Sequence, residues 1–152
     1  MKSFHLICVG KLKNASLENI ELDYLKRIAL PELVIHEVRA RAENKLIEGE
    51  AILKKIKEIE KESTGYKIAI TEWGKTYNSV EFAQFTDILL ENKSKIIFII
   101  AGAEGFTQEV LNVCSEKISL SPLTFPHKIA RVLLIEQIYR AQTIREKHPY
   151  HN

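Results

Sequence analysis

The chain has 152 residues, of which 45% are hydrophobic and 28% are charged, a balance typical of a globular protein and unlike that of a disordered or fibrous one. This length predicts a single domain, 1–152, around one hydrophobic core. No apolar run approaches the roughly 20 residues that cross a bilayer, and Lys2 is followed by a strand-like stretch rather than a signal peptide, so we expect a cytoplasmic protein. The formal net charge is only +2, but 127–152 holds five Lys or Arg against two Glu. This segment is the first place to look for contact with nucleic acid, although a solvated helix face would carry similar charges.

The first half of the chain alternates between strand-like and helical patterns. Short apolar runs predict strands at 4–9, 33–38 and 66–71. A first helix is expected between Ser16, its candidate N-cap, and Pro31, and a second over 43–62 with one charged, solvated face. Trp73-Gly74-Lys75 is expected to form the turn after the third strand.

The second half continues the alternation. Ser79 is a candidate N-cap for a third helix, and 95–101 is the most hydrophobic strand and is predicted at the centre of the sheet. A short helix, a short strand and a long helix are then expected at 107–114, 118–120 and 127–147. Strands that alternate with helices predict an α/β fold, a parallel sheet with helices on both faces. Ligands bind such sheets beyond the carboxyl ends of the strands, which directs attention to three loops, 72–76, 102–107 and 121–127.

Two of these loops have compositions that suit a ligand. Gly102 and Gly105 allow backbone amides to approach a ligand closely, although they would equally serve a tight turn. The glycines lack the spacing of a dinucleotide-binding fold or a P-loop, which argues against a nicotinamide enzyme and an NTPase. The segment 120–126 is stiffened by two prolines, and its apolar side chains could line a slot for a purine; otherwise it is a connector.

The two cysteines, Cys8 and Cys114, lie within apolar stretches and have neither CxxC spacing nor further ligands nearby. We therefore expect buried thiols and no metal site or disulfide.

The C-terminal quarter carries a set of residues that resembles a known family. Between Ile118 and His151, the chain resembles the C-terminal signature of the RlmH family of SPOUT-class pseudouridine methyltransferases, through Pro126-His127, Arg131, Glu136-Gln137, Tyr139-Arg140-Ala141 and Tyr150-His151. Val9-Gly10-Lys11 and the turn from Gly102 to Gly105 match in order and spacing, so the resemblance covers essentially the whole chain.

This resemblance implies a SPOUT fold, in which a trefoil knot near the C-terminus forms the pocket for S-adenosylmethionine. It implies N3-methylation of a pseudouridine in 23S rRNA of the large subunit by a homodimer with a site shared between subunits. The cofactor contacts carried over to this chain are Ile70, Gly102, Leu120, Ser121, Pro122, Leu123, Thr124 and Phe125. Two positions depart from the family: Ala101 replaces a glycine, and Asn152 stands where relatives often end with a basic residue.

The chemistry requires alignment of the methyl donor with the attacking nitrogen and loss of a proton from that nitrogen. The candidates for accepting the proton are His127, Tyr150 and His151, with solvent or an RNA group as alternatives. Arg131 and Arg140 are candidates to hold RNA phosphate or to brace the junction of sheet and helix.

The last helix holds ten apolar residues within 129–144, too many for one stripe, and dimerisation would explain this excess. Because the basic segment is small, binding to naked RNA should be weak, and an assembled ribosome is the expected substrate. Two alternatives stay open: a SPOUT methyltransferase that acts on tRNA or protein, and a non-enzymatic, flavodoxin-like nucleotide-binding module.

Overall fold

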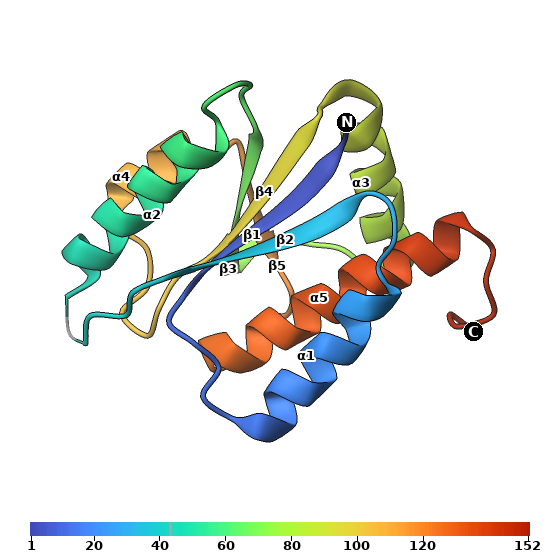
Figure 1. Ribbon diagram of the computed structural model, residues 1–152, viewed down its shortest axis with the longest axis horizontal. Coiled ribbons are helices and arrows are strands. Elements are labelled where there is room, and N and C mark those ends of the chain that lie inside the picture. Colours follow the sequence, from blue (N-terminus) through green and yellow to red (C-terminus); the bar gives the residue numbers. More distant parts are fainter. Residues whose placement is uncertain (43) are drawn as a thin grey trace.

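A five-stranded sheet lies between two layers of helices in the computed structural model, which describes residues 1–42 and 44–152 (Figure 1). In chain order the elements are β1 (Ser3–Val9), α1 (Ala15–Arg27), β2 (Glu32–Val38), α2 (Lys45–Ile59), β3 (Tyr66–Thr76), α3 (Ser79–Asn92), β4 (Lys95–Ile100), α4 (Gln108–Val113), β5 (Glu116–Ser119) and α5 (His127–Arg145). The predicted α/β alternation is confirmed.

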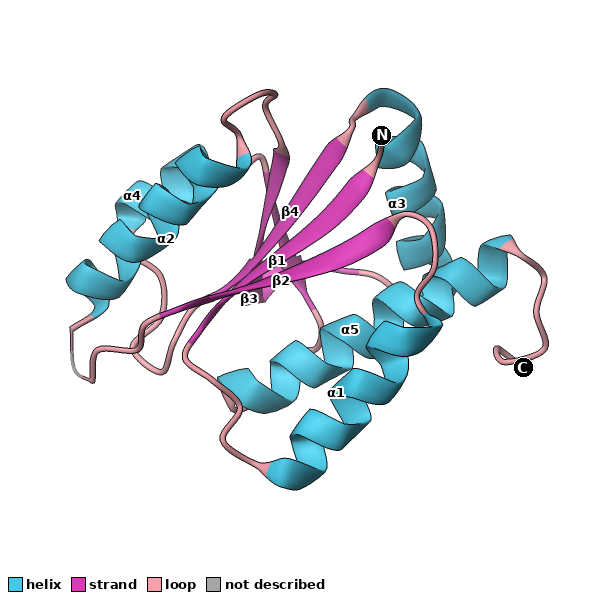
Figure 2. Cartoon of the chain, viewed as in Figure 1, coloured by secondary structure: helices cyan, strands magenta, loops and turns pink. Residues whose placement is uncertain are grey.

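The strand order is β2-β1-β4-β3-β5, and every described pair is parallel. β4 is the middle strand, as predicted from its sequence. The chain leaves β1 through α1 on one face of the sheet and leaves β4 through α4 on the other (Figure 2). Adjacent strands whose connections diverge in this way create a crevice at their carboxyl ends, where ligands of α/β folds bind.

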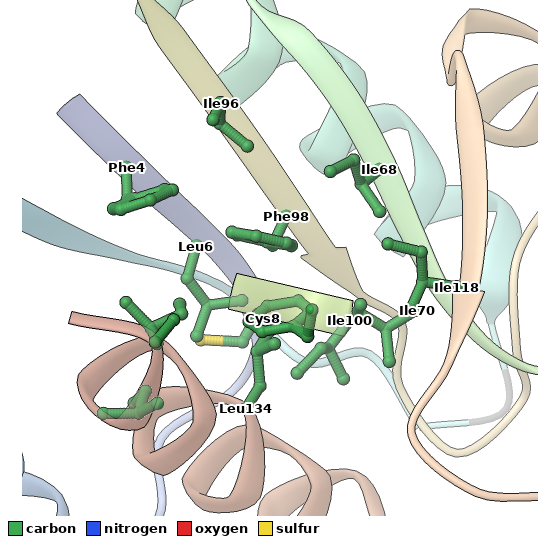
Figure 3. Packing of buried hydrophobic residues seen from close by; sticks show 14 of the residues in the cluster. Phe4, Leu6, Cys8, Ile68, Ile70, Ile96, Phe98, Ile100, Ile118 and Leu134 are labelled. Atoms are coloured by element: carbon green, nitrogen blue, oxygen red, sulfur yellow. The ribbon is translucent and has the colours of Figure 1, made fainter. Parts of the chain in front are cut away.

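Alternate residues of β1 face opposite layers. Leu6 and Cys8 pack toward α1, α3 and α5, in the core shown in Figure 3, whereas Ile7 and Val9 pack toward α2 and α4. Full burial of each large aliphatic or aromatic side chain contributes roughly 1.5 to 3 kcal/mol. The sheet is therefore held from both sides, which fixes the loops at its carboxyl edge.

Several element boundaries differ from those predicted. Asn14 and Asn78, rather than Ser16 and Ser79, cap α1 and α3. The side chain of each asparagine accepts a hydrogen bond from the backbone amide three residues later in the chain. The predicted start of the second helix, Glu43, lies outside the described residues. β5 begins two residues earlier than the predicted strand 118–120.

The prediction of a turn at Trp73-Gly74-Lys75 was wrong, because β3 continues to Thr76. Its pairing with β5 shifts register between Ile70 and Lys75. A β-carbon at Gly74 would lie 2.6 Å from the backbone carbonyl carbon of Lys117, so the glycine lets the two strands approach closely. The extension carries Glu72 and Trp73 to the edge of the sheet where the loops meet.

The apolar excess of α5 has an explanation within the chain. α5 packs against α1 and α3 as well as the sheet, which buries residues on several of its sides. Ile129 and Leu133, one turn apart, stay 37% and 38% exposed. The excess therefore gives no independent evidence for a dimer, but this exposed pair remains available for one.

Among the described residues, no helix is both long and apolar enough to span a bilayer.

Candidate functional site

A cavity of about 830 Å³ opens at the carboxyl edge of the sheet, beyond β3 and β4. Three segments line it: 70–73 of β3, 100–106 after β4, and most of 120–127 before α5. The predicted cofactor residues that line this cavity are Ile70, Gly102, Leu120, Ser121, Leu123, Thr124 and Phe125. Pro122 belongs to the same loop but is not part of the lining.

Side-chain hydrogen bonds tie the loop before α5 to the extended part of β3. The Ser119 hydroxyl lies 3.0 Å from the Glu72 carbonyl oxygen and 2.8 Å from that of Ser121, and Thr124 Oγ1 donates to Glu72 Oε2 at 2.9 Å. Because two prolines and these contacts restrict the loop, it loses little conformational entropy when it binds a ligand.

The opposite wall is the turn that follows β4. The Gly105 amide donates to the Gly102 carbonyl at 3.0 Å, and Gly105 has a φ of +85°, which favours glycine. A β-carbon at Gly102 would lie 2.7 Å from Oε1 of Glu48 on α2. The first glycine therefore permits close packing against a helix, and the second permits the turn.

Glu48 is a residue that the sequence analysis did not single out. It is only 6% exposed; its Oε2 accepts a hydrogen bond from the Arg41 amide at 2.9 Å, whereas its Oε1 has no hydrogen-bond partner among the described residues. The signal was present, because Glu48 shares helical spacing with the buried Ile52 and Ile56. Leu46 and Ile47, apolar residues in the first turn of the same helix, are by contrast exposed.

His127 is the predicted catalytic residue that the structure places at the cavity. Partial burial lowers the pKa of its imidazole, the charge of Lys128 lowers it further, and the charge of Glu48 acts in the opposite direction. A lowered pKa keeps the ring neutral near pH 7, the form that can accept a proton.

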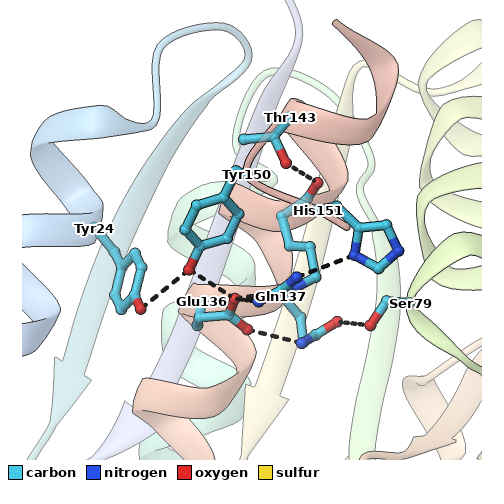
Figure 4. Close-up of polar contacts among 8 residues, drawn as sticks. Tyr24, Ser79, Glu136, Gln137, Thr143, Tyr150 and His151 are labelled. Atoms are coloured by element: carbon cyan, nitrogen blue, oxygen red, sulfur yellow. Dashed lines mark hydrogen bonds and ion pairs between the residues drawn. The ribbon is translucent and has the colours of Figure 1, made fainter. Parts of the chain in front are cut away.

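Tyr150 and His151 lie together elsewhere, folded against α5 (Figure 4). The Tyr150 hydroxyl lies 3.1 Å from Glu136 Oε1 and 3.2 Å from the Tyr24 hydroxyl. Burial, the hydrogen bond with Tyr24 and the charge of Glu136 all raise the pKa of Tyr150. Its hydroxyl therefore stays protonated at neutral pH and suits a hydrogen-bond donor rather than a base.

Arg140 joins the two tail residues. Its guanidinium lies 4.7 Å from the centre of the Tyr150 ring, 3.0 Å from His151 Nδ1 and 2.8 Å from Glu136 Oε1. The tail thus has packing contacts of its own.

Tyr150 and His151 do not line the cavity at His127. Their partners Glu136 and Arg140 follow His127 on α5 by 9 and 13 residues, a separation of about 14 to 20 Å at 1.5 Å per residue. A single chain therefore does not bring the three predicted catalytic residues together.

Arg131 is 5% exposed and fully engaged with carboxylates. It binds Glu21 through two hydrogen bonds of 2.7 and 2.8 Å and Glu37 through one of 2.8 Å. This arrangement favours the bracing role over contact with phosphate.

The remaining titratable clusters lack features of a metal centre. The described residues hold no group of three or more His, Cys, Asp or Glu arranged to bind a metal ion. Burial raises the pKa of Cys8 to about 12 and that of Cys114 to about 11, so both thiols are poor nucleophiles.

The chain is similar to known proteins over almost its whole length. A family model described as "Predicted SPOUT methyltransferase" matches residues 1–151. "Ribosomal RNA large subunit methyltransferase H" of Prochlorococcus marinus (strain NATL1A) is 40% identical over 97% of this chain and 94% of its own length. The protein of the same name from Clostridium novyi (strain NT) is 40% identical over 96% and 97%.

A probable methylase family protein from Haemophilus influenzae Rd KW20 has a similar solved structure, with a TM-score of 0.60 at 12% identity over 99% of this chain and 71% of that one. At this identity the likeness concerns the fold alone. The family model and the full-length relatives together show that this chain belongs to the SPOUT methyltransferases and, within them, to the RlmH family.

Proposed function

We propose that this chain transfers a methyl group from S-adenosylmethionine to N3 of a pseudouridine in 23S rRNA of the large ribosomal subunit. The observation that carries the proposal is the cavity between the Gly102 turn and the loop 120–126, with His127 at its edge. The matched relatives are named as methyltransferases of large-subunit ribosomal RNA, which supports the class of substrate.

The residues present suit S-adenosylmethionine. The cavity volume lies within the roughly 300 to 1,000 Å³ of small-molecule sites. Ile70, Leu120 and Phe125 provide apolar walls for a purine ring, and the carboxylates of Glu72 and Glu104 complement a cationic ligand. When bound, this cofactor would supply an electrophilic methyl group on a sulfonium.

The chain's own residues then orient the reactants and handle one proton. The loop 120–126 and the Gly102 turn hold the donor, and orientation of this kind supplies effective molarities of about 10⁵ to 10⁸ M. We assign acceptance of the N3 proton to His127, because its lowered pKa favours the neutral imidazole, and a positioned base of this kind raises the rate by about 10² to 10⁴.

A homodimer is part of the proposal. Because the tail lies about 14 to 20 Å along α5 from His127, we propose that Tyr150 and His151 of one subunit serve the cavity of the other. The exposed Ile129 and Leu133 follow His127 by two and six residues on α5 and suit a contact between subunits beside the cavity.

The trefoil knot is also proposed, from family membership and from the packing of the loop 120–126 against the extended β3. Pulling the chain from both termini tests it. A knotted chain tightens and reaches a shorter contour length than 152 extended residues allow, whereas the full length would contradict a knot.

The decisive test of activity is methyl transfer from labelled S-adenosylmethionine to ribosomes and to free rRNA, both from a strain without this protein, with the product nucleoside identified by mass. Label on a pseudouridine of ribosomal 23S rRNA is the expected result. Label on tRNA or protein, offered as separate acceptors, without label on rRNA would contradict rRNA as the substrate. Efficient labelling of free rRNA would contradict an assembled ribosome as the substrate, and absence of cofactor binding would contradict the proposed methyl transfer.

A further inference from the structure

A second cavity, of about 790 Å³, lies at the carboxyl ends of β1 and β2. Its walls are the segments that follow these strands, 9–13 and 37–40, and the first turn of α5. Gly10, with a φ of +78°, turns the chain out of β1 after its amide donates to the Val38 carbonyl at 2.7 Å. The predicted cofactor contacts and the predicted RNA contacts Arg131 and Arg140 lie outside these walls, whereas His127, a predicted catalytic residue, belongs to them.

The lining is strongly cationic. Four basic side chains contribute to it: Lys11, Lys13, Arg39 and Lys128. Within the described ranges, 1–42 and 44–152, no carboxylate lies within ion-pairing distance of any of the four. Glu37, the acidic residue of the lining, is already paired with Arg131 at 2.8 Å. Among the described residues, no ion pair neutralises these four cations, and a positive field of this kind attracts anions.

The cationic cavity adjoins the proposed cofactor cavity. His127 lines both, and a β-carbon at Gly102 in the first cavity would lie 3.2 Å from Cγ1 of Val9 in the second. A nucleotide whose base reaches His127 therefore lies at the boundary between the two cavities. Glu72 and Glu104 line the first cavity, whereas the described lining of the second has four cations and one carboxylate, Glu37, which is paired with Arg131. The two cavities therefore suit ligands of opposite charge.

We propose that the cationic cavity binds backbone phosphates of the RNA strand next to the target nucleotide. This inference rests on the proposed function and assigns its substrate a second point of attachment. Lysine binds phosphate as a compact point charge without reading a base, which suits residues that position a strand while the other cavity holds the donor.

The test compares the double variant K11Q/K128Q with a matched control, K54Q/K57Q, which removes the same charge from exposed positions of α2. The probe is purified large ribosomal subunits, whose binding is measured at several salt concentrations. Each lost phosphate contact should reduce the slope of log affinity against log salt by about 1, so K11Q/K128Q should lose about 2. Its affinity at low salt should fall at least tenfold, and the KM for subunits should rise more than kcat falls. The control and the cofactor affinity of both variants should match the unmodified protein.

An unchanged slope in K11Q/K128Q would overturn the inference, even with weaker binding, because the loss would not concern phosphate. If K11Q/K128Q lost the dimer and the control did not, the cavity would be a contact between subunits rather than an RNA site, and this result would also overturn the inference. Inorganic phosphate that saturates the cavity without competing with subunits would indicate a free anion as the ligand, contrary to the proposal. The salt dependence of binding is measured without methyl transfer. The proposed function is tested separately, because its failure would be an absence of methyl transfer by the unmodified protein.

Discussion

Oε1 of Glu48 and the α-carbon of Gly102 lie so close that a β-carbon on the glycine would be 2.7 Å from the oxygen. The glycine belongs to the wall of the proposed cofactor cavity, and the carboxylate belongs to a helix on the far side of that wall. The shape of the cavity is thus coupled to a buried charge.

Substitution of Gly102 tests this coupling. G102A should lower the free energy of unfolding by about 1 to 3 kcal/mol, because the added methyl group overpacks the contact, and it should weaken binding of S-adenosylmethionine. The double variant G102A/E48A should recover part of the loss, measured by urea unfolding and calorimetric titration in a double-mutant cycle. Strictly additive effects would contradict a direct contact.

The charge of Glu48 also acts on His127. Since that charge raises the pKa of His127 against burial and Lys128, E48Q should lower the pKa further and K128Q should raise it, as followed by NMR titration of the imidazole. If neutral His127 accepts the proton, the acid limb of the rate profile should move to lower pH in E48Q and to higher pH in K128Q. If the acid limb moved in the same direction in E48Q and in K128Q, His127 would not be the base.

The ion pairs of Arg131 predict a stability effect. The side chains of Arg131 and Glu21 are 6% and 10% exposed, so R131A should lower the free energy of unfolding by about 3 to 5 kcal/mol by leaving a buried carboxylate unpaired. R27A is the control, because its partner Asp23 is 57% exposed and such pairs contribute about 0 to 1 kcal/mol. Equal losses in urea unfolding would contradict the structural role of Arg131.

The shared site predicts complementation between inactive variants. A protomer with H127A keeps its tail, and one without Tyr150–Asn152 keeps its cavity, so a mixed dimer contains one site with both parts intact. Random exchange of subunits makes half the dimers mixed, so activity should return to about a quarter of that of the unmodified protein. Recovery measured by methyl transfer supports the shared site; no recovery despite confirmed exchange contradicts it.

The paired histidines of β1 and β2 predict an acid-sensitive fold. His5 Nδ1 and His36 Nε2 lie 2.9 Å apart, and burial together with the charges of His36 and Lys95 lowers the pKa of His5 from 6.5 to about 4. The folded state then binds fewer protons than the unfolded chain, so the free energy of unfolding should fall as pH drops from about 6.5 to about 4, by at most about 1.4 kcal/mol per pH unit for this one proton. H5Q should flatten the decline in urea midpoint over this range, and an unchanged decline would assign it to other groups.

The order of strands and helices could be predicted because each has an apolar pattern of its own. The loop 120–126 and the Gly102 turn could be located because parallel sheets place ligands at one edge. The extension of β3 could not, since Gly74 serves a backbone contact with Lys117 that only the folded chain creates. Burial of Glu48 was not predicted, because a charged residue of an amphipathic helix normally faces solvent. In this chain, the Glu48 carboxylate lies on the apolar face of α2.

The sheet order also governs when the site can exist during synthesis. β1, made first, lies between β2 and β4, and its pairing with β4 waits until residues 95–100 have been made. The cavity walls at 120–127 and the helix that follows come later still. A nascent chain interrupted before residue 120 would lack one wall of the cavity, so the proposed site for the methyl donor is complete only near the end of translation, after most of the sheet is available to fold.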